Sequence, residues 1–385
     1  MRIAVFTDSY RPYVSGVVNS IDLFSEELRK SGHEFALFAP KYPGYVDQQD
    51  HVYRFCSVKA PTNPGYRLAI PLSTSVSLRI KEFGTDIVHT HSPFLMGGLG
   101  ARVARKNRLP LVFTYHTLYE RYVHYARVAE KWAKQKMRDV SRKYCNRCDL
   151  VIAPTEGIRG LLLEYGVETD IMVNPTGVEV ERFKEKDPLW LRLRYGISET
   201  DRVLLYVGRL GKEKSVDFLI RSFRQILRRE QDVSLVIVAG GPEESSLKRL
   251  AETEGVASKV VFTGPIPPES VHRAYAGGDI FVFASETDTQ GMVLTEAMAA
   301  GLPVVAVRAF GSRDMVDDGV NGILTEADEE AFASAVVSIL QSASVLNRLS
   351  IRAREKAETV STSVTARRLE EAYASLLERH RRLSG

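Results

Sequence analysis

The sequence predicts an α/β protein with two domains, each built on a parallel sheet that helices cover on both faces. At 385 residues the chain is longer than one hydrophobic core usually extends, so two domains are expected. Short apolar runs of strand length alternate with segments of helical length, and the alternation starts again near residue 201. Pro and Gly interrupt the pattern between Asn174 and Gly177, where we place the domain boundary.

The individual elements follow from apolar runs bounded by turn residues. In the first half, strands are expected at residues 3–6, 35–39, 87–90, 111–114 and 150–153, with helices at 18–30, 97–106 and 156–165. In the second half, strands are expected at 203–207, 235–239, 260–262, 280–283 and 303–306, with a helix at 215–228. The predicted domains are therefore 1–173 and 178–361, and a C-terminal helix at 362–385 is expected to pack back on the first domain.

Composition narrows the class of protein. Hydrophobic residues make up 44% and charged residues 26%, which fits a globular domain in water. No run approaches 18 uncharged apolar residues, so no membrane-spanning helix is expected. The N-terminal ten residues resemble a first strand and lack the pattern of a signal peptide. Cys56, Cys145 and Cys148 make no disulfide framework, which favours a reducing cytoplasm, and the Cys145–Cys148 spacing alone does not indicate a metal site.

The net charge of +4 is unevenly distributed along the chain. Residues 1–175 carry 24 Lys/Arg against 17 Asp/Glu, and the remainder carries 28 against 31. A basic first half indicates an anionic partner, either a membrane surface or a nucleic acid, or else only a solvated surface. Nine of the basic residues lie within 121–147, which predicts either an amphipathic helix on an anionic leaflet or a plain solvated helix.

The stretch from residue 283 to 305 is the strongest candidate for the chemistry. A buried strand is followed by a polar loop and then by a helix that begins near Gly291. The N–H groups of Gly291, Met292 and Val293 would face an anion at the positive end of this helix. Glu296 would accept ribose hydroxyls and Asp288 sugar hydroxyls, unless the two are only a helix-surface and a helix-start residue.

Two other loops follow predicted strands. Arg209 and Lys214 could neutralise a diphosphate, although a charged loop without a ligand has the same composition. The long loop from Thr7 ends at Gly16, whose lack of a side chain lets its backbone N–H approach a phosphate closely. No GxGxxG fingerprint is present, so this loop does not predict a dinucleotide site.

The segment after the strand at 111–114 combines a histidine with several aromatic residues. His116 lies just past the strand end, where active sites of parallel sheets occur. Tyr115, Tyr119, Tyr122 and Tyr125 would suit an amphiphilic or sugar acceptor if exposed, or an interdomain core if buried. The nearby His89 and His91 are interpreted as structural, and no third ligand is spaced for zinc.

Taken together, these motifs resemble the retaining glycosyltransferases of family 4. The residues that carry the resemblance are the Asp8-to-Gly16 loop, Thr114 to His116, Gly208 to Leu210 with Glu213 and Lys214, Phe262 to Gly264, Glu296 to Ala299 and Gly301 to Val305. The resemblance covers nearly the whole chain and implies the GT-B fold, in which two Rossmann-like domains have parallel sheets facing a central cleft. It implies a nucleotide sugar on the C-terminal domain and an acceptor on the N-terminal one.

The resemblance also assigns roles by position. Catalytic roles fall to His116, Arg209, Lys214 and Asp288. The donor-binding residues are Gly16, Arg209, Lys214, Ile266, Asp288, Gln290, Gly291, Met292, Val293 and Glu296. The acceptor-binding residues are Tyr10, Tyr119, Tyr122 and His124. Neither a metal nor a cofactor is expected, because Arg209 and Lys214 would neutralise the diphosphate.

Within the family, the stretches 90–97, 114–125 and 174–177 look most like the bacterial diacylglycerol glucosyltransferases. This similarity implies that the donor is a UDP-sugar, namely UDP-glucose, and that the acceptor is diacylglycerol or another lipid or sugar. It also implies a cytoplasmic enzyme that is peripheral on the inner face of the cell membrane. Asp288 stands where the family pattern often has Glu, so a GDP-mannose-dependent α-mannosyltransferase is the alternative. A sugar-nucleotide sensor and a nucleic-acid-binding protein are the alternatives outside this enzyme class, although we expect no nucleic acid partner.

Overall fold

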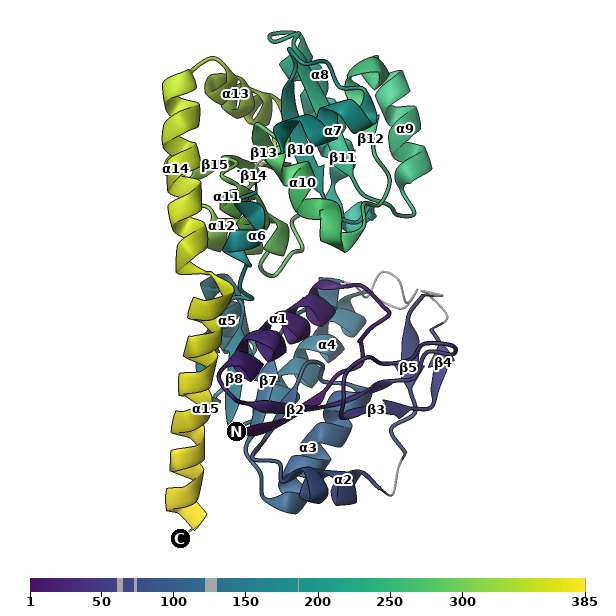
Figure 1. Ribbon diagram of the computed structural model, residues 1–385, viewed down its shortest axis with the longest axis vertical. Helices are drawn as coiled ribbons and strands as arrows, with labels where there is room; N and C mark the ends of the chain where they lie inside the picture. Colours follow the sequence, from purple (N-terminus) through teal and green to yellow (C-terminus); the bar gives the residue numbers. More distant parts are fainter. Residues whose placement is uncertain (61–64, 73–74, 122–129, 186, 385) are drawn as a thin grey trace. The chain divides into compact units, whose positions relative to one another are not determined.

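The computed structural model describes residues 1–60, 65–72, 75–121, 130–185 and 187–384 (Figure 1). The chain divides into two compact units. Unit 1 comprises Met1–Gly177 with Thr362–Gly385, and unit 2 comprises Val178–Ser361. Each unit holds a parallel sheet with helices, so the predicted α/β class with two Rossmann-like domains is confirmed. Its last helix groups with unit 1, and the division falls directly after Gly177.

Unit 1 contains a seven-stranded sheet in the order β3-β2-β1-β6-β7-β8-β9, with every pairing parallel. Its elements are β1 (Arg2–Phe6), α1 (Gly16–Lys30), β2 (Glu34–Pro40), β3 (Val52–Phe55), β4 (Ser57–Lys59), β5 (Arg67–Ala69), α2 (Val76–Phe83), β6 (Ile87–Thr90), α3 (Leu95–Asn107), β7 (Leu111–Thr114), η1 (Tyr119–Arg121), α4 (Glu130–Cys145), β8 (Leu150–Ala153), α5 (Glu156–Glu164), β9 (Ile171–Val173) and α15 (Thr362–Ser384). Strands β4 and β5 form a separate antiparallel pair.

Unit 2 contains a six-stranded parallel sheet in the order β12-β11-β10-β13-β14-β15. Its elements are α6 (Val180–Phe183), α7 (Pro188–Tyr195), β10 (Arg202–Val207), η3 (Lys212–Lys214), α8 (Val216–Leu227), β11 (Val233–Val238), α9 (Glu244–Thr253), η4 (Ala257–Lys259), β12 (Val260–Phe262), η5 (Pro268–Ser270), α10 (Val271–Ala276), β13 (Ile280–Phe283), α11 (Met292–Ala300), β14 (Val304–Val307), α12 (Phe310–Met315), β15 (Gly322–Thr325), α13 (Glu329–Leu340) and α14 (Ala343–Thr359).

The central strands are buried along their whole length because helices cover both faces of each sheet. All four residues of β6, β7, β13 and β14 are buried, as parallel sheets require. In unit 1, α15 lies beside α1 (Figure 1), and Leu369 and Tyr373 share a core cluster with Ile21, Phe24 and Leu28. This shared core explains why the C-terminal helix groups with the first unit.

The strand orders place particular loops next to one another. In unit 2, β10 lies between β11 and β13, so the chain leaves β10 at a switch point where neighbouring loops diverge. The loops after β10 and β13 therefore emerge side by side at the carboxyl edge. In unit 1, β1 lies between β2 and β6, which brings the loop after β1 next to the loop after β6.

The structure differs from the expected elements mainly at the sheet margins. Strands β3, β9 and β15 were not predicted, because short margin strands lack the continuous apolar run of the centre. Helix α1 begins at Gly16, and α3 at Leu95, each two residues earlier than expected. Within the basic stretch 121–147, the described helix is α4, and residues 122–129 lie outside the described part of the chain.

Candidate active site

In unit 2, the loop after β10 is fixed by its own backbone. The N–H of the buried Leu210 donates to the carbonyl of Gly240, 3.1 Å away, and the hydroxyl of Tyr206 donates to the carbonyl of Arg209 at 3.2 Å. A Cβ on Gly241 would lie 2.4 Å from the Leu210 carbonyl oxygen, so only glycine permits this approach. The Arg209 side chain is exposed at this edge, where an anionic ligand could reach it.

The loop after β13 is tied to the loop after β10. The hydroxyls of Ser285 and Thr287 both donate to the carbonyl oxygen of Glu213, at 3.2 and 3.3 Å. The ammonium of Lys214 lies 2.6 Å from a carboxylate oxygen of Asp288, and the two side chains are 18% and 21% exposed. The structure therefore brings together two residues that the sequence placed in separate motifs, 74 positions apart.

A third loop supports Asp288 from the direction of β14. The N–H of Gly311, in α12, donates to the backbone carbonyl of Asp288 at 3.1 Å. A Cβ at Gly311 would meet the backbone of the buried Gln290 at 2.7 Å. Sequence reasoning missed Gly311, and its position just after a predicted strand was the only local signal. The loop that carries Asp288 follows β13, and it is therefore held by the segments that follow the neighbouring strands β10 and β14.

Gly291 ends this loop in the left-handed conformation and caps α11. Its φ of 71° favours glycine, and its carbonyl accepts the N–H of Leu294 at 2.8 Å. Met292 and Val293, which are half-buried, form the first turn of the helix, as expected from the sequence. Their N–H groups lie at the positive end of α11, where backbone donors remain for an anion.

Glu296 lies one turn further along α11 and is half-buried. Its carboxylate accepts a hydrogen bond of 2.6 Å from the hydroxyl of Tyr275, a buried residue of α10 that sequence reasoning missed. Burial raises the pKa of Glu296, while the Tyr275 hydrogen bond and the charge of Arg182 act in the opposite direction. Glu296 is thus a held carboxylate, not a solvated helix-surface residue. Ile266, after β12, is half-buried and packs against the hydrophobic cluster of unit 2 that contains Tyr275.

In unit 1, His116 belongs to a chain of stacked imidazoles. Its Nε2 lies 2.8 Å from Nδ1 of His91, and the two rings stack with centroids 5.1 Å apart. His91 stacks in turn on His89, whose Nδ1 lies 2.6 Å from the Tyr373 hydroxyl and whose Nε2 lies 2.7 Å from the Thr114 hydroxyl. The sequence predicted a site for His116 but not its direct contact with His91.

These three histidines are neutral at physiological pH. Burial lowers the pKa of His89 to about 3 and that of His116 to about 4, and it holds the pKa of His91 well below the ordinary range. Each neutral ring has one N–H donor and one acceptor nitrogen. His116 can therefore take part in hydrogen bonds with hydroxyl groups without bringing a positive charge to the site.

Asp8 lies in the loop after β1, and its carboxylate binds this loop to the start of α3. The buried Asp8 carboxylate accepts the N–H of Met96 at 3.0 Å and the hydroxyl of Ser92. Burial raises the pKa of Asp8, and these two hydrogen bonds oppose the rise. Gly16 lies at the other end of the loop as the exposed first residue of α1, next to the capping Ser15.

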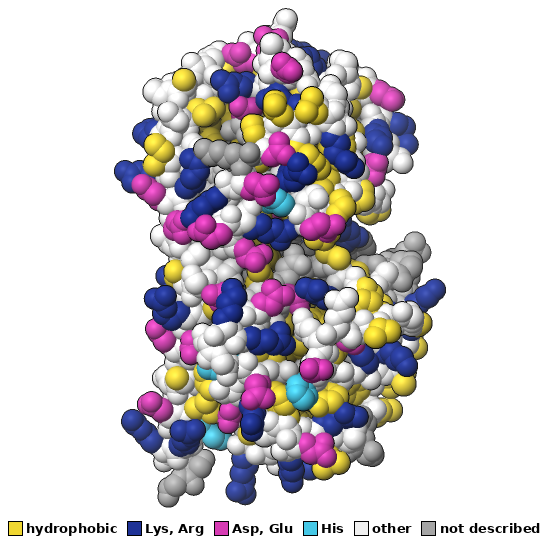
Figure 2. Space-filling view, in the orientation of Figure 1, with side chains coloured by type: hydrophobic (Ala, Val, Ile, Leu, Met, Phe, Trp, Pro, Cys, Tyr) yellow, Lys and Arg dark blue, Asp and Glu magenta, His cyan; other side chains and the backbone are white. Residues whose placement is uncertain are grey.

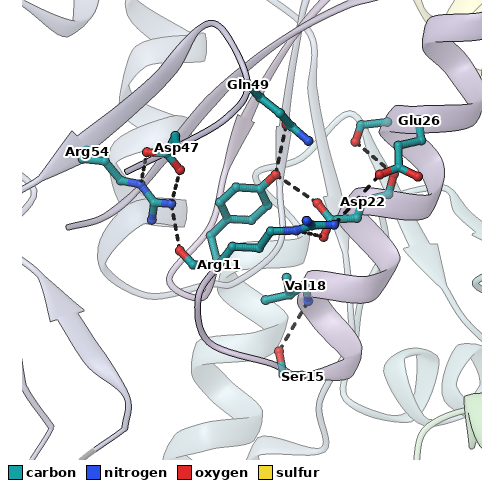
Figure 3. A network of polar contacts seen from close by, with 10 residues as sticks. Arg11, Ser15, Val18, Asp22, Glu26, Asp47, Gln49 and Arg54 are labelled. Carbon is teal, nitrogen blue, oxygen red and sulfur yellow. Dashed lines mark hydrogen bonds and ion pairs between the residues drawn. The ribbon is translucent and has the colours of Figure 1, made fainter. Parts of the chain in front are cut away.

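Tyr10 joins this loop to α1, whose residue Asp22 is labelled in Figure 3 together with Arg11. Its hydroxyl donates to Asp22 at 2.9 Å, and Arg11 donates to the other oxygen of Asp22 at 2.7 Å. Arg54 donates to the backbone carbonyl of Arg11 at 2.8 Å. Tyr10 is only 2% exposed, so its placement is that of a core residue. Contact between Tyr10 and an acceptor stays a prediction that this burial does not favour.

The aromatic segment after β7 is partly described. Tyr115 is fully buried, and its ring meets the half-buried Tyr119 edge-on at 5.6 Å. Tyr119 also packs edge-on against Phe94, which is 41% exposed, at 4.9 Å. The predicted acceptor residues Tyr122 and His124 lie outside the described residues. Tyr119 is therefore the described member of this group that is best placed near a surface.

Helix α4 directs its basic side chains outward. Ala133, Ser141, Tyr144 and Cys145 face the core of unit 1, and burial raises the pKa of the Cys145 and Cys148 thiols. The exposed residues are Lys131, Trp132, Gln135, Lys136, Arg138, Arg142 and Lys143, and Lys136 lies over the Trp132 ring at 4.7 Å. We call the seven exposed residues of α4 named in the previous sentence the basic face.

On the face of the molecule drawn in Figure 2, Lys and Arg are interspersed with Asp and Glu.

Two further observations concern metals and membranes. Among the described residues, no group of three or more His, Cys, Asp or Glu side chains is arranged to hold a metal ion. No single helix in the described ranges has both the length and the apolar character needed to cross a membrane, although α13 and α14 pass that test as a pair bent by 99°.

Comparison with known proteins identifies relatives over nearly the whole chain. Residues 14–182 match the family described as Glycosyltransferase Family 4, and residues 191–356 match Glycosyl transferases group 1. The alpha-monoglucosyldiacylglycerol synthase of Streptococcus pneumoniae is 31% identical over 97% of this chain and 85% of that protein. The synthase of Acholeplasma laidlawii is 28% identical over 99% and 98%. A GDP-mannose-dependent alpha-mannosyltransferase of Corynebacterium glutamicum is 31% identical over 85% and 77%.

Solved structures agree on the fold. Anabaena Alr3699/HepE, solved in complex with UDP-glucose, matches with a TM-score of 0.78 at 19% identity, over 97% of this chain and 100% of that one. Sucrose-phosphate synthase from Thermosynechococcus elongatus matches with a TM-score of 0.77 at 20% identity, over 98% and 99%. The two family matches and the relative at 31% identity show that the chain belongs to the family 4 glycosyltransferases, enzymes of the GT-B fold.

Proposed function

We propose that this glycosyltransferase moves glucose from UDP-glucose to a membrane lipid such as diacylglycerol, with retention of the anomeric configuration. The observation that carries the proposal is the set of groups at the carboxyl edge of the unit 2 sheet. Arg209, Lys214, Asp288 and the start of α11 come from the ends of two adjacent strands. Such a set suits a ligand with a diphosphate at one end and hydroxyl groups at the other.

The donor would be held without a metal. Arg209 and Lys214 supply two positive charges, and the first turn of α11 supplies backbone donors, so the negative charge that grows on the leaving diphosphate is stabilised. Glu296, positioned by Tyr275, would accept the ribose hydroxyls. Asp288 would accept hydroxyls of the transferred glucose.

Retention follows from the direction of attack that we propose. The acceptor hydroxyl would approach the sugar from the face that the diphosphate leaves, and the departing phosphate oxygen would receive the hydroxyl proton. A neutral His116 would hydrogen-bond to the transferred sugar without repelling an oxocarbenium-like transition state. We assign no side chain as a covalent nucleophile.

A lipid acceptor is supported by the relatives and by the basic face of α4. Two of the relatives are, by name, synthases of alpha-monoglucosyldiacylglycerol, which is a glucosylated lipid. Lys131, Lys136 and Lys143 are exposed on the same helix as the exposed Trp132, a combination that suits the headgroup region of an anionic leaflet. We propose a cytoplasmic enzyme that binds the inner face of the cell membrane peripherally and has no nucleic acid partner.

A donor panel tests this proposal. The full-length protein is incubated with UDP-glucose, UDP-galactose or GDP-mannose and with vesicles that contain anionic phospholipid, with or without diacylglycerol. We expect glucosyl transfer only from UDP-glucose with diacylglycerol present, and no loss of rate when a chelator is added. Transfer from GDP-mannose alone would overturn the donor assignment, and glucosylation that ignores diacylglycerol would overturn the acceptor assignment.

A GDP-mannose-dependent mannosyltransferase is the second candidate. It is favoured by the Corynebacterium relative, whose identity to this chain equals that of the Streptococcus synthase, and by Asp288 in place of the commoner Glu. The same donor panel separates the two candidates. A sensor without activity would bind a nucleotide sugar in calorimetry and release no nucleoside diphosphate with any acceptor.

A further inference from the structure

We propose that the ion pair between Lys214 and Asp288 is a resting contact that only a complete nucleotide sugar can replace at both ends. The diphosphate would take the place of Asp288 at Lys214, while a sugar hydroxyl would take the place of Lys214 at Asp288. A nucleoside diphosphate without its sugar could supply a new partner to Lys214 but not to Asp288. The inference rests on the donor site proposed above and concerns how that site discriminates donor from product.

The geometry of the resting pair supports an exchange of side-chain partners on a fixed backbone. The Lys214 ammonium lies 2.6 Å from the Asp288 carboxylate. Their backbones are held independently of this contact, by the bonds to the Glu213 carbonyl on one side and by the Gly311 N–H on the other. Opening the ion pair therefore requires rotation of two side chains and leaves the hydrogen-bonded loops in place.

The shielding of the pair determines the energetic consequence. The two side chains are 18% and 21% exposed, so water replaces a lost partner less well than it would on an open surface. When a diphosphate alone binds at Lys214, Asp288 loses its cation and faces additional negative charge. This repulsion opposes the binding of the nucleoside diphosphate.

The complete donor avoids much of this cost because its sugar supplies hydroxyl donors to Asp288. After transfer, the sugar leaves with the acceptor, and the carboxylate again faces a diphosphate without a compensating donor. The re-forming Lys214–Asp288 pair would then help to expel the product. Asp288 would thus contribute to product release as well as to sugar recognition.

Calorimetry with UDP and with UDP-glucose tests the exchange in full-length protein. Asp288→Asn removes the negative charge and keeps a similar shape, so we expect UDP to bind about tenfold more tightly than to the wild-type protein. UDP-glucose should gain less or bind more weakly, because the amide accepts sugar hydroxyls less well than a carboxylate. Asp288→Ala should also bind UDP more tightly, which guards against an effect peculiar to asparagine.

Glu329→Gln is the matched control, because Glu329 forms an ion pair of the same 2.6 Å length with Arg221 and neither residue is assigned to the candidate site. Both ligand affinities should match wild type in this variant. The inference is overturned if both Asp288 variants bind UDP no more tightly than wild type, or if Glu329→Gln produces the same gain. Absence of UDP binding by a folded wild-type protein would instead overturn the proposed donor site itself.

Discussion

The two units build their predicted parts of the site by different means. In unit 2, charged side chains extend from loops that backbone hydrogen bonds fasten together, as at Glu213, Leu210 and Gly311. In unit 1, the corresponding strand ends carry the buried His89 and His91 and the half-buried His116, all three neutral. The first arrangement suits a ligand with formal charge, and the second suits hydroxyl groups and a low dielectric.

Because of this contrast, substitutions in the two units should have different consequences. A charge at an exposed loop can be removed without disturbing the fold, so its loss should appear in catalysis. A buried ring that is hydrogen-bonded to its neighbours contributes to stability as well, so changes there should appear in folding and in pH dependence. Four variants or conditions follow from this distinction.

Arg209→Ala should have the largest effect. The side chain is exposed, so the fold should be unaffected, while loss of one charge-stabilising group should reduce turnover by about two orders of magnitude or more. Initial rates with UDP-glucose and diacylglycerol vesicles measure this loss. Arg228→Ala, an exposed arginine at the end of α8, is the control. Turnover within threefold of wild type would remove Arg209 from the site.

Gly311→Ala should impair the same unit through its backbone. The new methyl group would lie 2.7–2.9 Å from the backbone of Asp288 and Gln290, so the loop must shift. We expect a loss of about 1–3 kcal/mol in unfolding free energy and at least tenfold lower turnover. Gly160→Ala, a helix position with no atom within 4 Å of the added Cβ, should retain activity and stability. Equal behaviour of the two variants would contradict the crowding argument.

Acid should destabilise unit 1 through its three histidines. Their folded-state pKa values lie below the ordinary 6.5, so as pH falls below about 6.5 the unfolded chain takes up protons first. Each histidine should remove about 1.4 kcal/mol per pH unit, while Asp8, whose pKa is raised, acts in the opposite direction.

Hydrogen exchange at pH 7, 6 and 5 measures this effect separately in each unit. Strands β6 and β7 of unit 1 should lose protection more steeply than β10 and β13 of unit 2. His89→Gln should reduce the slope in unit 1, because one of the three groups no longer titrates. Parallel loss of protection in both units would show that these three histidines do not set the acid sensitivity.

Charge reversal on the basic face of α4 should have the smallest effect per residue. Lys136→Glu and Lys143→Glu should each weaken binding to anionic vesicles by several fold, since a basic group near such a surface contributes about 1 kcal/mol. Cosedimentation at low and moderate salt measures it. Lys248→Glu, in α9 of unit 2, is the control. Unchanged binding of both α4 variants would exclude this face as the membrane contact.

The parts of this account that the sequence predicted are those written in local patterns. Apolar runs identified the central strands, because a parallel sheet buries both faces of each strand. Gly291 at the loop-to-helix joint was visible because a left-handed residue before a helix favours glycine. Arg209 also lay in a recognisable loop after a strand.

The remainder depended on contacts between distant segments. The pairing of Lys214 with Asp288 joins loops 74 positions apart, and the contact of His89 with Tyr373 joins β6 to the last helix. Such contacts leave no periodic trace in one sequence. Tyr10 is a further example, because its place in the loop after β1 predicted an acceptor contact, which stays a prediction, and no local pattern indicated that its hydroxyl donates to Asp22 of α1.

The anomeric configuration of the product distinguishes same-face attack from inversion. The full-length protein would be supplied with UDP-glucose and diacylglycerol in anionic vesicles, and the isolated glycolipid would be examined by proton NMR. We expect an α-linked glucosyl lipid, because UDP-glucose carries an α-linked sugar and transfer should retain this configuration. A β-linked product would contradict same-face attack, and absence of any glucosyl lipid would contradict the proposed reaction.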